Sequence, residues 1–430
     1  MREMKDSGVE WIGEIPGDWQ TRKLFGLLSN IGSGTTPKGD DYYIDGTIPW
    51  LNTGDLNDQL IERTSKAVTA LALEECSALQ LHEAGAVVIA MYGATIGKLG
   101  ITTIDLTTNQ ACCVMNPSNK LDKKYLFYVL VSAKDYFIFS SYGSGQPNIS
   151  QNTIRNLKVP FMEIVEQKRI ADYLDVKCSK IDSIIAKQEE IIEKLKEYKL
   201  SVITEAVTKG LNPAVDMKDS GDEWISDIPK HCSVTRCGRL YRIILGKMLA
   251  TEPKDDSDTL EKYFCAANVH YEGINKTDLK VMWFSDKEKE QFRVKNNDLL
   301  VVEGGAGAGG ASIICEIDDD YYVQNSIMIV RSDSEIRNRW LYYTLYMLVK
   351  RKYIDFVCNK ATIPHFTKEK LGNVPVTIFP EDEMKSIVDF LDDCCERIDK
   401  TIKDRENSIN KLLEYKKSLI YEVVTGKKEV

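Results

Sequence analysis

Two glycine-rich segments have residue types and spacing that approach a nucleotide-binding motif. Gly305, Gly307 and Gly310 show the G-x-G-x-x-G spacing of a dinucleotide-binding turn. The following residues, Ala311-Ser-Ile-Ile-Cys-Glu-Ile, read as a strand, whereas pyrophosphate binding needs a helix N-terminus there. The segment 92–98 (Tyr-Gly-Ala-Thr-Ile-Gly-Lys) lacks the glycine and the Ser/Thr that a phosphate-cradling loop requires at its two ends. Both segments are therefore predicted to be hairpin tips.

The other reactive residues indicate no catalytic or metal site. The four histidines are scattered, and none has the spacing of a metal-binding helix or of a Ser/His/Asp arrangement. The eleven cysteines include no Cys-x-x-Cys pair and are expected to be reduced. Cys178 and Cys395 are interpreted as small buried hydrophobes on helix faces. The many carboxylates are interpreted as solvated surface, because their density is highest in turns and at helix ends.

The chain contains an internal repeat, which organises all its elements. Residues 4–16 (MKDSGVEWIGEIP) recur as residues 217–229 (MKDSGDEWISDIP), with three differences. A second repeated segment begins with Ile170-Ala-Asp-Tyr-Leu-Asp and recurs 217 residues later as Ile387-Val-Asp-Phe-Leu-Asp. Between these matched ends the two halves share a hydrophobic pattern but little identity. Similar ends thus enclose dissimilar middle segments.

Each second repeated segment is predicted to be a helix of about 45 residues, or about 70 Å, because apolar residues recur every three or four positions. The predicted apolar seam consists of Leu174, Ile181, Ile185, Ile192, Leu195 and Val202 in the first copy, and of Leu391, Ile398, Ile402, Ile409, Leu412 and Leu419 in the second. So long and narrow a seam needs an equally long partner, which favours an antiparallel coiled coil of the two helices. The alternative is that each helix packs separately on its own domain.

The predicted fold class is α+β, with two globular domains of pseudo-twofold symmetry separated by the antiparallel coiled coil. The predicted division is residues 1–160, a first domain; 161–213, the first helix with a linker; 214–376, a second domain; and 377–430, the second helix. Within the domains, segments 86–92, 110–115, 298–303 and 326–330 read as strands, whereas 66–73 and 124–139 read as helices.

Charge and hydropathy narrow the possible partners. A net charge of -9 argues against binding of phosphate through bulk charge. No apolar run approaches the roughly 20 residues of a membrane span, and residues 1–11 have no signal-peptide core. We therefore expect a cytoplasmic protein without a membrane partner.

The repeated Asp-Ser-Gly-x-Glu-Trp-Ile-x-x-Ile-Pro motif and the segment Glu166-Gln-Lys-Arg-Ile-Ala-Asp-Tyr-Leu-Asp resemble the specificity (S) subunit of Type I restriction-modification systems. The resemblance covers essentially the whole chain, although Glu383-Met384 stands where the first helix has Glu166-Gln167. It implies two target-recognition domains, each reading half of a bipartite asymmetric double-stranded DNA site, with the helices setting the spacer. The implied protein partners are two modification (methyltransferase) subunits and the restriction (endonuclease/translocase) subunits.

The resemblance also implies that this chain is not an enzyme and has no cofactor of its own. S-adenosylmethionine, ATP and Mg²⁺ are expected only in the partner subunits. The implied DNA-contacting segments yield these candidate residues: Ser33, Thr35, Thr36, Lys38, Asn52, Lys98, Gln110, Ser144, Gln146, Asn148, Ser150, Lys247, Asn268, Asn325, Lys360, Thr362, His365 and Lys368. Amide side chains suit adenine edges, threonine methyls suit thymine methyls, and lysines suit phosphates.

A second function from another class fits the same architecture. A coiled-coil adaptor with two variable protein-binding domains would show the same repeats and the same lack of catalytic motifs. Co-purification of an adenine methyltransferase favours the DNA-reading function, whereas pairing with an unrelated protein and indifference to DNA favour the adaptor.

Overall fold

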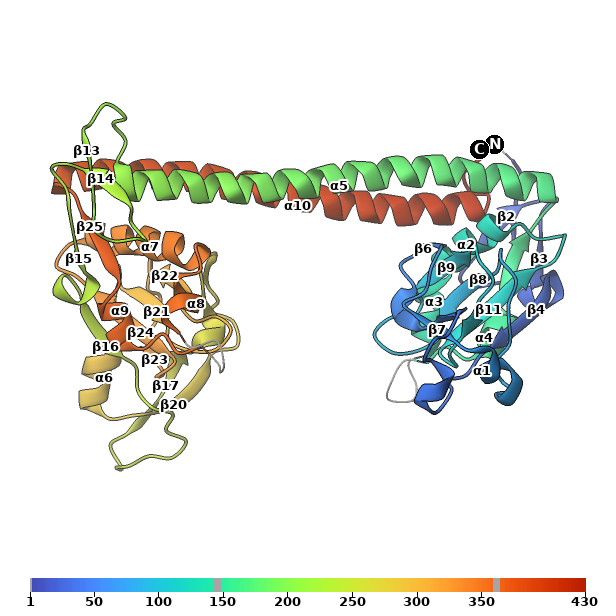
Figure 1. The fold of residues 1–430 in the computed structure, drawn as a ribbon, viewed down its shortest axis with the longest axis horizontal. Coiled ribbons are helices and arrows are strands. Elements are labelled where there is room, and N and C mark those ends of the chain that lie inside the picture. The colour runs from blue at the N-terminus through green and yellow to red at the C-terminus, as the bar shows by residue number, and fades with distance from the viewer. Residues whose placement is uncertain (1, 142–147, 359–363) are drawn as a thin grey trace. The chain divides into compact units, whose positions relative to one another are not determined.

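A computed structural model describes residues 2–141, 148–358 and 364–430. The chain forms two compact units, one of residues 1–189 with 406–430 (unit 1) and one of residues 190–405 (unit 2) (Figure 1). Each unit combines a mixed helix-and-strand domain with one part of each long helix, so the predicted α+β class is confirmed. The predicted division into residues 1–160, 161–213, 214–376 and 377–430 stays a prediction. The two compact units do not test it, because each contains parts of both long helices.

Unit 1 is built on two sheets. The larger sheet has the order β4 (Leu28–Ser33), β11 (Cys112–Pro117), β8 (Val87–Ala90), β9 (Leu99–Thr102), β6 (Gln59–Ile61), and the smaller has the order β10 (Thr107–Thr108), β5 (Ile48–Leu51), β7 (Lys66–Val68). Its other helices and strands are β1 (Met4–Asp6), β2 (Glu14–Pro16), β3 (Gln20–Lys23), β12 (Lys158–Phe161), α1 (Ala70–Glu75), α2 (Lys123–Ser132), α3 (Lys134–Ser141) and α4 (Gln151–Asn156). The helix predicted over 66–73 is wrong in its first part, because residues 66–68 pair with β5 as a strand.

Unit 2 repeats this plan with different residues. Its larger sheet has the order β16 (Arg242–Leu245), β24 (Ile327–Arg331), β21 (Leu299–Val302), β22 (Ala311–Ile313), and a second sheet has the order β20 (Lys280–Phe284), β17 (Thr259–Phe264), β23 (Tyr322–Val323). The remaining helices and strands are β13 (Met217–Asp219), β14 (Asp227–Pro229), β15 (Ser233–Arg236), β18 (Val269–His270), β19 (Gly273–Ile274), β25 (Pro375–Ile378), α6 (Asp286–Phe292), α7 (Glu335–Lys350), α8 (Tyr353–Val357) and α9 (Lys368–Gly372).

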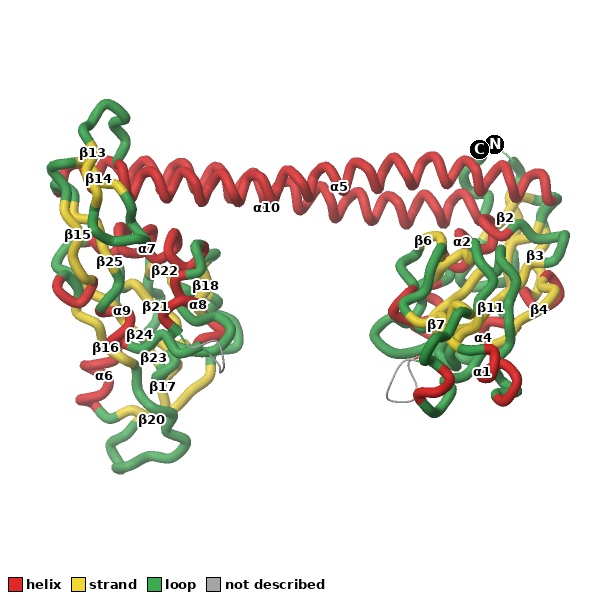
Figure 2. The backbone as a smooth tube through the Cα atoms, in the orientation of Figure 1, coloured by secondary structure: helices red, strands yellow, loops and turns green. Residues whose placement is uncertain are grey.

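The two predicted long helices are confirmed as α5 (Ile164–Lys209) and α10 (Glu381–Val424), which Figure 2 draws as continuous helices. Acidic residues lie in the first turn of each, where they oppose the helix dipole. Gly210 and Gly426 follow the two C-termini with φ of 78° and 74°, the left-handed conformation that ends a helix and that glycine adopts without strain.

The predicted seam lies between α5 and α10. None of its twelve residues is exposed. In unit 1, Ile181 and Leu419 share one apolar cluster, and in unit 2, Leu391 packs with residues 202 and 203 of α5. The alternative of helices packed separately is therefore wrong, because each unit buries both helices in a common core.

An ion pair of identical residue types joins the two long helices in each unit. Asp182 of α5 pairs with Lys416 of α10 at 2.6 Å in unit 1, and Lys199 of α5 pairs with Asp399 of α10 at 2.7 Å in unit 2. From the first pair to the second, the residue number rises from 182 to 199 on α5 and falls from 416 to 399 on α10. The helices therefore run antiparallel, as predicted.

A second duplicated arrangement attaches each domain to its nearest long helix. In unit 1 the Tyr128 hydroxyl donates to Asp175 at 2.7 Å, and Lys124 donates to the same carboxylate at 2.6 Å. In unit 2 the Tyr343 hydroxyl donates to Asp392 at 2.6 Å, and this carboxylate also pairs with Arg339. Burial, together with the hydrogen bond to the carboxylate, raises the pKa of both tyrosines, so each hydroxyl stays protonated and donating.

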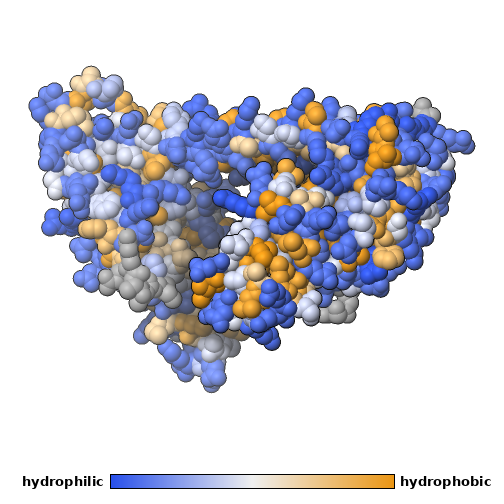
Figure 3. Space-filling model, turned by 45° about the vertical axis from the view of Figure 1, so that its right-hand side comes forward, coloured by the Kyte–Doolittle hydropathy of each residue, from blue (hydrophilic) through white to orange (hydrophobic). Residues whose placement is uncertain are grey.

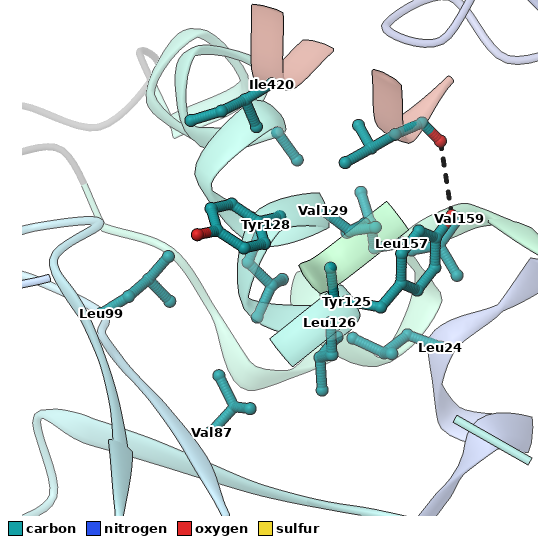
Figure 4. Packing of buried hydrophobic residues seen from close by; sticks show 14 of the residues in the cluster. Leu24, Val87, Leu99, Tyr125, Leu126, Tyr128, Val129, Leu157, Val159 and Ile420 are labelled. Carbon is teal, nitrogen blue, oxygen red and sulfur yellow. Dashed lines mark hydrogen bonds between the residues drawn. The ribbon is translucent and has the colours of Figure 1, made fainter. Parts of the chain in front are cut away.

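The core of unit 1 joins the sheet, α2 and both long helices. Tyr125, which is fully buried, extends its hydroxyl to the Val424 carbonyl near the end of α10 at 3.3 Å (Figure 4). Val87 of β8 and Ile420 of α10 belong to the same cluster. The face drawn in Figure 3 is mostly hydrophilic, with apolar side chains in scattered patches.

The cysteines are free thiols, and most of them are buried. Desolvation raises the pKa of Cys178 to about 11 and that of Cys395 to about 12, so both thiols are protonated at neutral pH. The interpretation of these two residues as small buried hydrophobes is confirmed.

The tyrosine–aspartate anchor can be tested at Asp392. Replacing Asp392 with Ala leaves the Tyr343 hydroxyl and the half-buried Arg339 without their acceptor, so we expect the free energy of unfolding to fall by about 1–3 kcal/mol in urea denaturation. The control is Asp393→Ala, which removes an exposed ion pair with Arg397 and should cost less than about 1 kcal/mol. Equal stabilities of the two variants would contradict the anchor.

The helix seam can be tested with paired charges. Leu195→Asp together with Leu412→Asp puts carboxylates into the seam and should lower the free energy of unfolding by several kcal/mol, on the order of the cost of losing buried leucines. Ile184→Asp with Leu413→Asp is the matched control, because these side chains are 46% and 49% exposed on the same helices. Unchanged melting of the seam variant would refute the paired-helix arrangement.

Candidate nucleic-acid interface

Four segments of unit 1 that are far apart in the sequence meet through hydrogen bonds. The Thr36 hydroxyl, after β4, donates to the Gln110 side chain at 2.8 Å. The Met91 N–H, after β8, donates to the Ala111 carbonyl at 2.8 Å, and the Ile149 N–H, before α4, donates to the Met91 carbonyl at 2.8 Å. We name these segments, residues 34–38, 91–98, 109–111 and 148–150, loop cluster 1.

Unit 2 builds the same arrangement. The Asn325 N–H donates to the Lys247 carbonyl at 2.8 Å, the Glu303 N–H to the Ser326 carbonyl at 2.8 Å, and the Phe366 N–H to the Glu303 carbonyl at 2.6 Å. We name residues 246–250, 303–310, 324–326 and 364–368 loop cluster 2. Main-chain groups make most of these bonds, so the frame is largely independent of side-chain identity.

The two glycine-rich segments are hairpin tips, as predicted. Residues 91–98 connect β8 to β9, and residues 303–310 connect β21 to β22, in both cases between antiparallel partners. Gly93 and Gly97 have φ of 83° and 74°, and Gly305 and Gly309 have φ of 87° and 80°, so both turns use the same left-handed positions. A β-carbon on Gly93 or Gly305 would meet no atom of the described residues within 4 Å.

In each loop cluster a glycine stands directly after a strand, Gly34 after β4 and Gly246 after β16. A β-carbon on Gly34 would lie 1.8 Å from the Thr108 carbonyl oxygen, and one on Gly246 would lie 2.4 Å from the Gln324 carbonyl oxygen. Two backbone segments therefore cross at a distance that excludes any side chain, and this crossing sets the path of the following loop.

Loop cluster 1 brings several predicted residues to one surface. Thr36, Lys38, Gln110, Asn148 and Ser150 are all exposed there. Ser33, Thr35 and Lys98 lie in or beside the cluster and are partly buried. The hydroxyl of Ser150 accepts the Thr153 N–H at 3.0 Å and so also caps α4.

Two asparagines that were predicted to contact DNA form hydrogen bonds within the protein. Asn52 accepts the Gly54 N–H at 2.7 Å and donates to Ser65 at 2.9 Å. Asn268, which is buried, accepts the Cys265 N–H at 3.0 Å and donates to the Asn275 carbonyl at 3.2 Å. Both amides hold turns, and reading a base would require these bonds to break.

Lys247 is also engaged internally. Its side chain is 6% exposed, pairs with Glu288 and lies over the Phe284 ring at 5.0 Å. Burial raises the pKa of Glu288, but the hydrogen bonds from Lys247 and Ser285 and the charge of Lys247 together outweigh it and lower that pKa. The positive charge of Lys247 is thus balanced by a carboxylate within the domain. In this geometry the ammonium group is not available to a DNA phosphate.

The remaining candidates divide by location. His365 and Lys368 are exposed in or beside loop cluster 2, and Asn325 is partly buried there. Ser144, Gln146, Lys360 and Thr362 lie outside the described residues.

Sequence reasoning missed a basic pocket beside loop cluster 1. The Arg155 guanidinium lies over the Phe25 ring at 4.2 Å, and Lys23 donates to Asn156 at 3.3 Å. These residues line an open pocket of about 660 Å³ with Gln151 and Asn152. No local pattern could reveal it, because folding brings residues 23 and 155 together from opposite ends of the domain.

Neither a metal-binding cluster nor a membrane-spanning helix occurs among the described residues. No group of three or more His, Cys, Asp or Glu side chains in this part of the chain has a metal-binding arrangement. No helix among the same residues is long and apolar enough to span a membrane.

The chain belongs to the family described as Type I restriction modification DNA specificity domain, which matches residues 16–197 and 240–411. The family pattern occurs once in each half, in keeping with the duplicated loop clusters. The predicted resemblance is confirmed, and this membership favours DNA reading over the coiled-coil adaptor.

Curated relatives carry names from the same class. The chain is 24% identical over 411 residues to the Type I restriction enzyme MjaIX specificity subunit of Methanocaldococcus jannaschii, covering 90% of this chain and 89% of the relative. It is 22% identical over 232 residues to the EcoR124I/EcoR124II specificity subunit of Escherichia coli, covering 52% of this chain and 48% of that protein.

Solved structures share the fold. A chain from a study of complex assembly and conformational transition of the type I R-M system aligns with a TM-score of 0.72 at 15% identity, covering 95% of this chain and 98% of that one. The HsdS subunit from Thermoanaerobacter tengcongensis aligns with a TM-score of 0.52 at 14% identity, covering 96% and 98%.

The crossing glycines give a test of the loop frame. Gly34→Ala should lower the free energy of unfolding by about 1–3 kcal/mol, because its β-carbon collides with backbone, and should speed hydrogen exchange in residues 35–38. Gly246→Ala should act in the same way on residues 247–250. Gly26→Ala is the control, because its β-carbon would meet no atom of the described residues within 4 Å. Stable alanine variants with unchanged exchange would show that the crossing is not constraining.

Proposed function

We propose that this chain is the DNA-specificity subunit of a Type I restriction-modification enzyme and that each loop cluster reads one half of a bipartite, asymmetric DNA sequence. The observation that carries the proposal is that one loop frame is built twice with unlike side chains. Thr36, Gln110 and Asn148 occupy it in unit 1, whereas Met248, Asn325 and His365 occupy it in unit 2. Two equal frames with different chemistry suit two different half-sites.

We further propose that residues 1–160 and 214–376 are the two target-recognition domains and that the long helices set the length of the unread spacer. The seam and the repeated Asp–Lys pair support this role, because they give the helices a single register. The helices are also proposed to dock two modification subunits, with restriction subunits completing the enzyme.

Catalysis is assigned to the partner subunits in this proposal, together with S-adenosylmethionine, ATP and Mg²⁺. The names of the curated relatives support the division, since they denote specificity subunits. We also place the protein in the cytoplasm, because all eleven cysteines are free thiols, as in a reducing compartment.

Phosphate contacts have to come from local basic groups, because the net charge is -9. Lys38, Lys98 and Arg155 are suited to this role in unit 1, and Lys368 in unit 2. Each would anchor the protein to the DNA backbone without specifying a base.

Exchange of one domain tests whether each domain reads one half-site. Residues 217–376 are replaced by the corresponding domain of another family member, and the hybrid is expressed with its modification subunits. Methylation-sensitive sequencing of the host genome should show one changed half-site and one unchanged half-site at the same spacing. A change in both half-sites, or in neither, would contradict the assignment of one domain to each.

A further inference from the structure

The loop after β16 presents two consecutive apolar side chains to solvent. Met248 is 75% exposed and Leu249 is 55% exposed. Among the large apolar side chains that are exposed in the described part of the chain, these are the only two adjacent in sequence. They lie in loop cluster 2, where Lys247 separates them from the crossing glycine Gly246.

This exposure is imposed by the loop frame. The Gly246 N–H donates to the Ile327 carbonyl at 3.0 Å, and the Lys247 N–H donates to the Val323 carbonyl at 3.0 Å. The side chain of Lys247 is directed inward, where it pairs with Glu288. With Lys247 fixed as a buried anchor, Met248 and Leu249 are held outside the core.

The loop is also fixed beyond these residues. The Trp283 N–H of β20 donates to the Ala250 carbonyl at 3.2 Å. The apolar pair therefore lies between two hydrogen-bonded points, at residues 247 and 250. The loop presents a defined apolar surface beside Asn325, whose N–H donates to the Lys247 carbonyl.

The equivalent position in unit 1 is polar. Ser33 ends β4 opposite Cys113 of β11, and Leu245 ends β16 opposite Met328 of β24, so the two loops leave equivalent strands. Thr36 is then the counterpart of Met248, and its hydroxyl is bonded to Gln110. The same place in the frame thus offers a hydroxyl and an amide in one unit and hydrocarbon and a thioether in the other.

We infer that Met248 and Leu249 are specificity-determining residues that contact thymine methyl groups in the half-site read by the second domain. This inference rests on the proposed DNA-reading function. The 5-methyl group of thymine is the apolar feature of the major groove, and apolar side chains recognise it by contact. Methionine adapts to such a surface because its thioether chain is flexible and polarisable.

The test uses the full chain bound to its modification subunits and duplexes carrying the recognised sequence. Each thymine of the second half-site is replaced in turn by deoxyuridine, which removes only the methyl group. For at least one position, the wild-type complex should bind about fourfold more weakly, the expected effect of losing one buried methyl. The double variant Met248→Ser/Leu249→Ser should bind the thymine and deoxyuridine duplexes equally.

Two variants serve as controls. Met248→Leu keeps an apolar side chain and should retain the sensitivity to deoxyuridine. Leu60→Ser removes another exposed apolar side chain, 56% exposed on β6 of unit 1, and should leave that sensitivity unchanged. Thermal melting of each variant should match that of the wild type, because the replaced side chains are exposed.

Several outcomes would overturn the inference while leaving the proposed function intact. They are a second half-site without an A·T pair, wild-type binding that ignores deoxyuridine, and a serine variant that loses affinity while the sensitivity remains. A complex with no sequence preference in either half-site would instead contradict the proposed function itself.

Discussion

The apolar seam of α5 and α10 is the constraint on which the rest of the structure depends. Each helix carries an apolar stripe longer than one small domain can cover, and in both units the other helix covers it. The ion pairs Asp182–Lys416 and Lys199–Asp399 join the helices in the observed antiparallel register. Each domain is then tied to its nearest helix by a buried tyrosine that donates to Asp175 or Asp392. Within each unit, the helix seam is thus connected through this hydrogen bond to the domain whose sheet carries the loop cluster.

In each loop cluster, the groups that hold the loops in place differ from the side chains that face the solvent. Main-chain hydrogen bonds, left-handed glycines and a backbone crossing hold the loops in both units, and almost none of this depends on exposed side chains. The exposed positions can therefore differ between the units at little cost to the fold. This arrangement explains how one architecture presents a hydroxyl and an amide in unit 1 and an apolar pair in unit 2.

Sequence reasoning predicted the features that depend on local pattern. The helix stripe, the terminal glycines and the hairpin tips follow from periodicity and backbone conformation, and the structure confirms them. It failed where partners come from distant segments. The inward side chain of Lys247 depends on Glu288. The predictions for Asn52 and Asn268 failed for a local reason instead, because each caps a turn by accepting an N–H two or three residues away. Residues 66–68 form a strand because they pair with β5, and the local sequence alone does not reveal this partner.

The most direct measurement is methylation-sensitive sequencing of DNA from cells that express this chain with its modification subunits. If the helix pair fixes the relation between two unlike reading domains, the methylated positions will define one bipartite motif, with two different half-sites and a single spacer length. A continuous motif, two identical half-sites or a spacer that varies from site to site would contradict this mechanism.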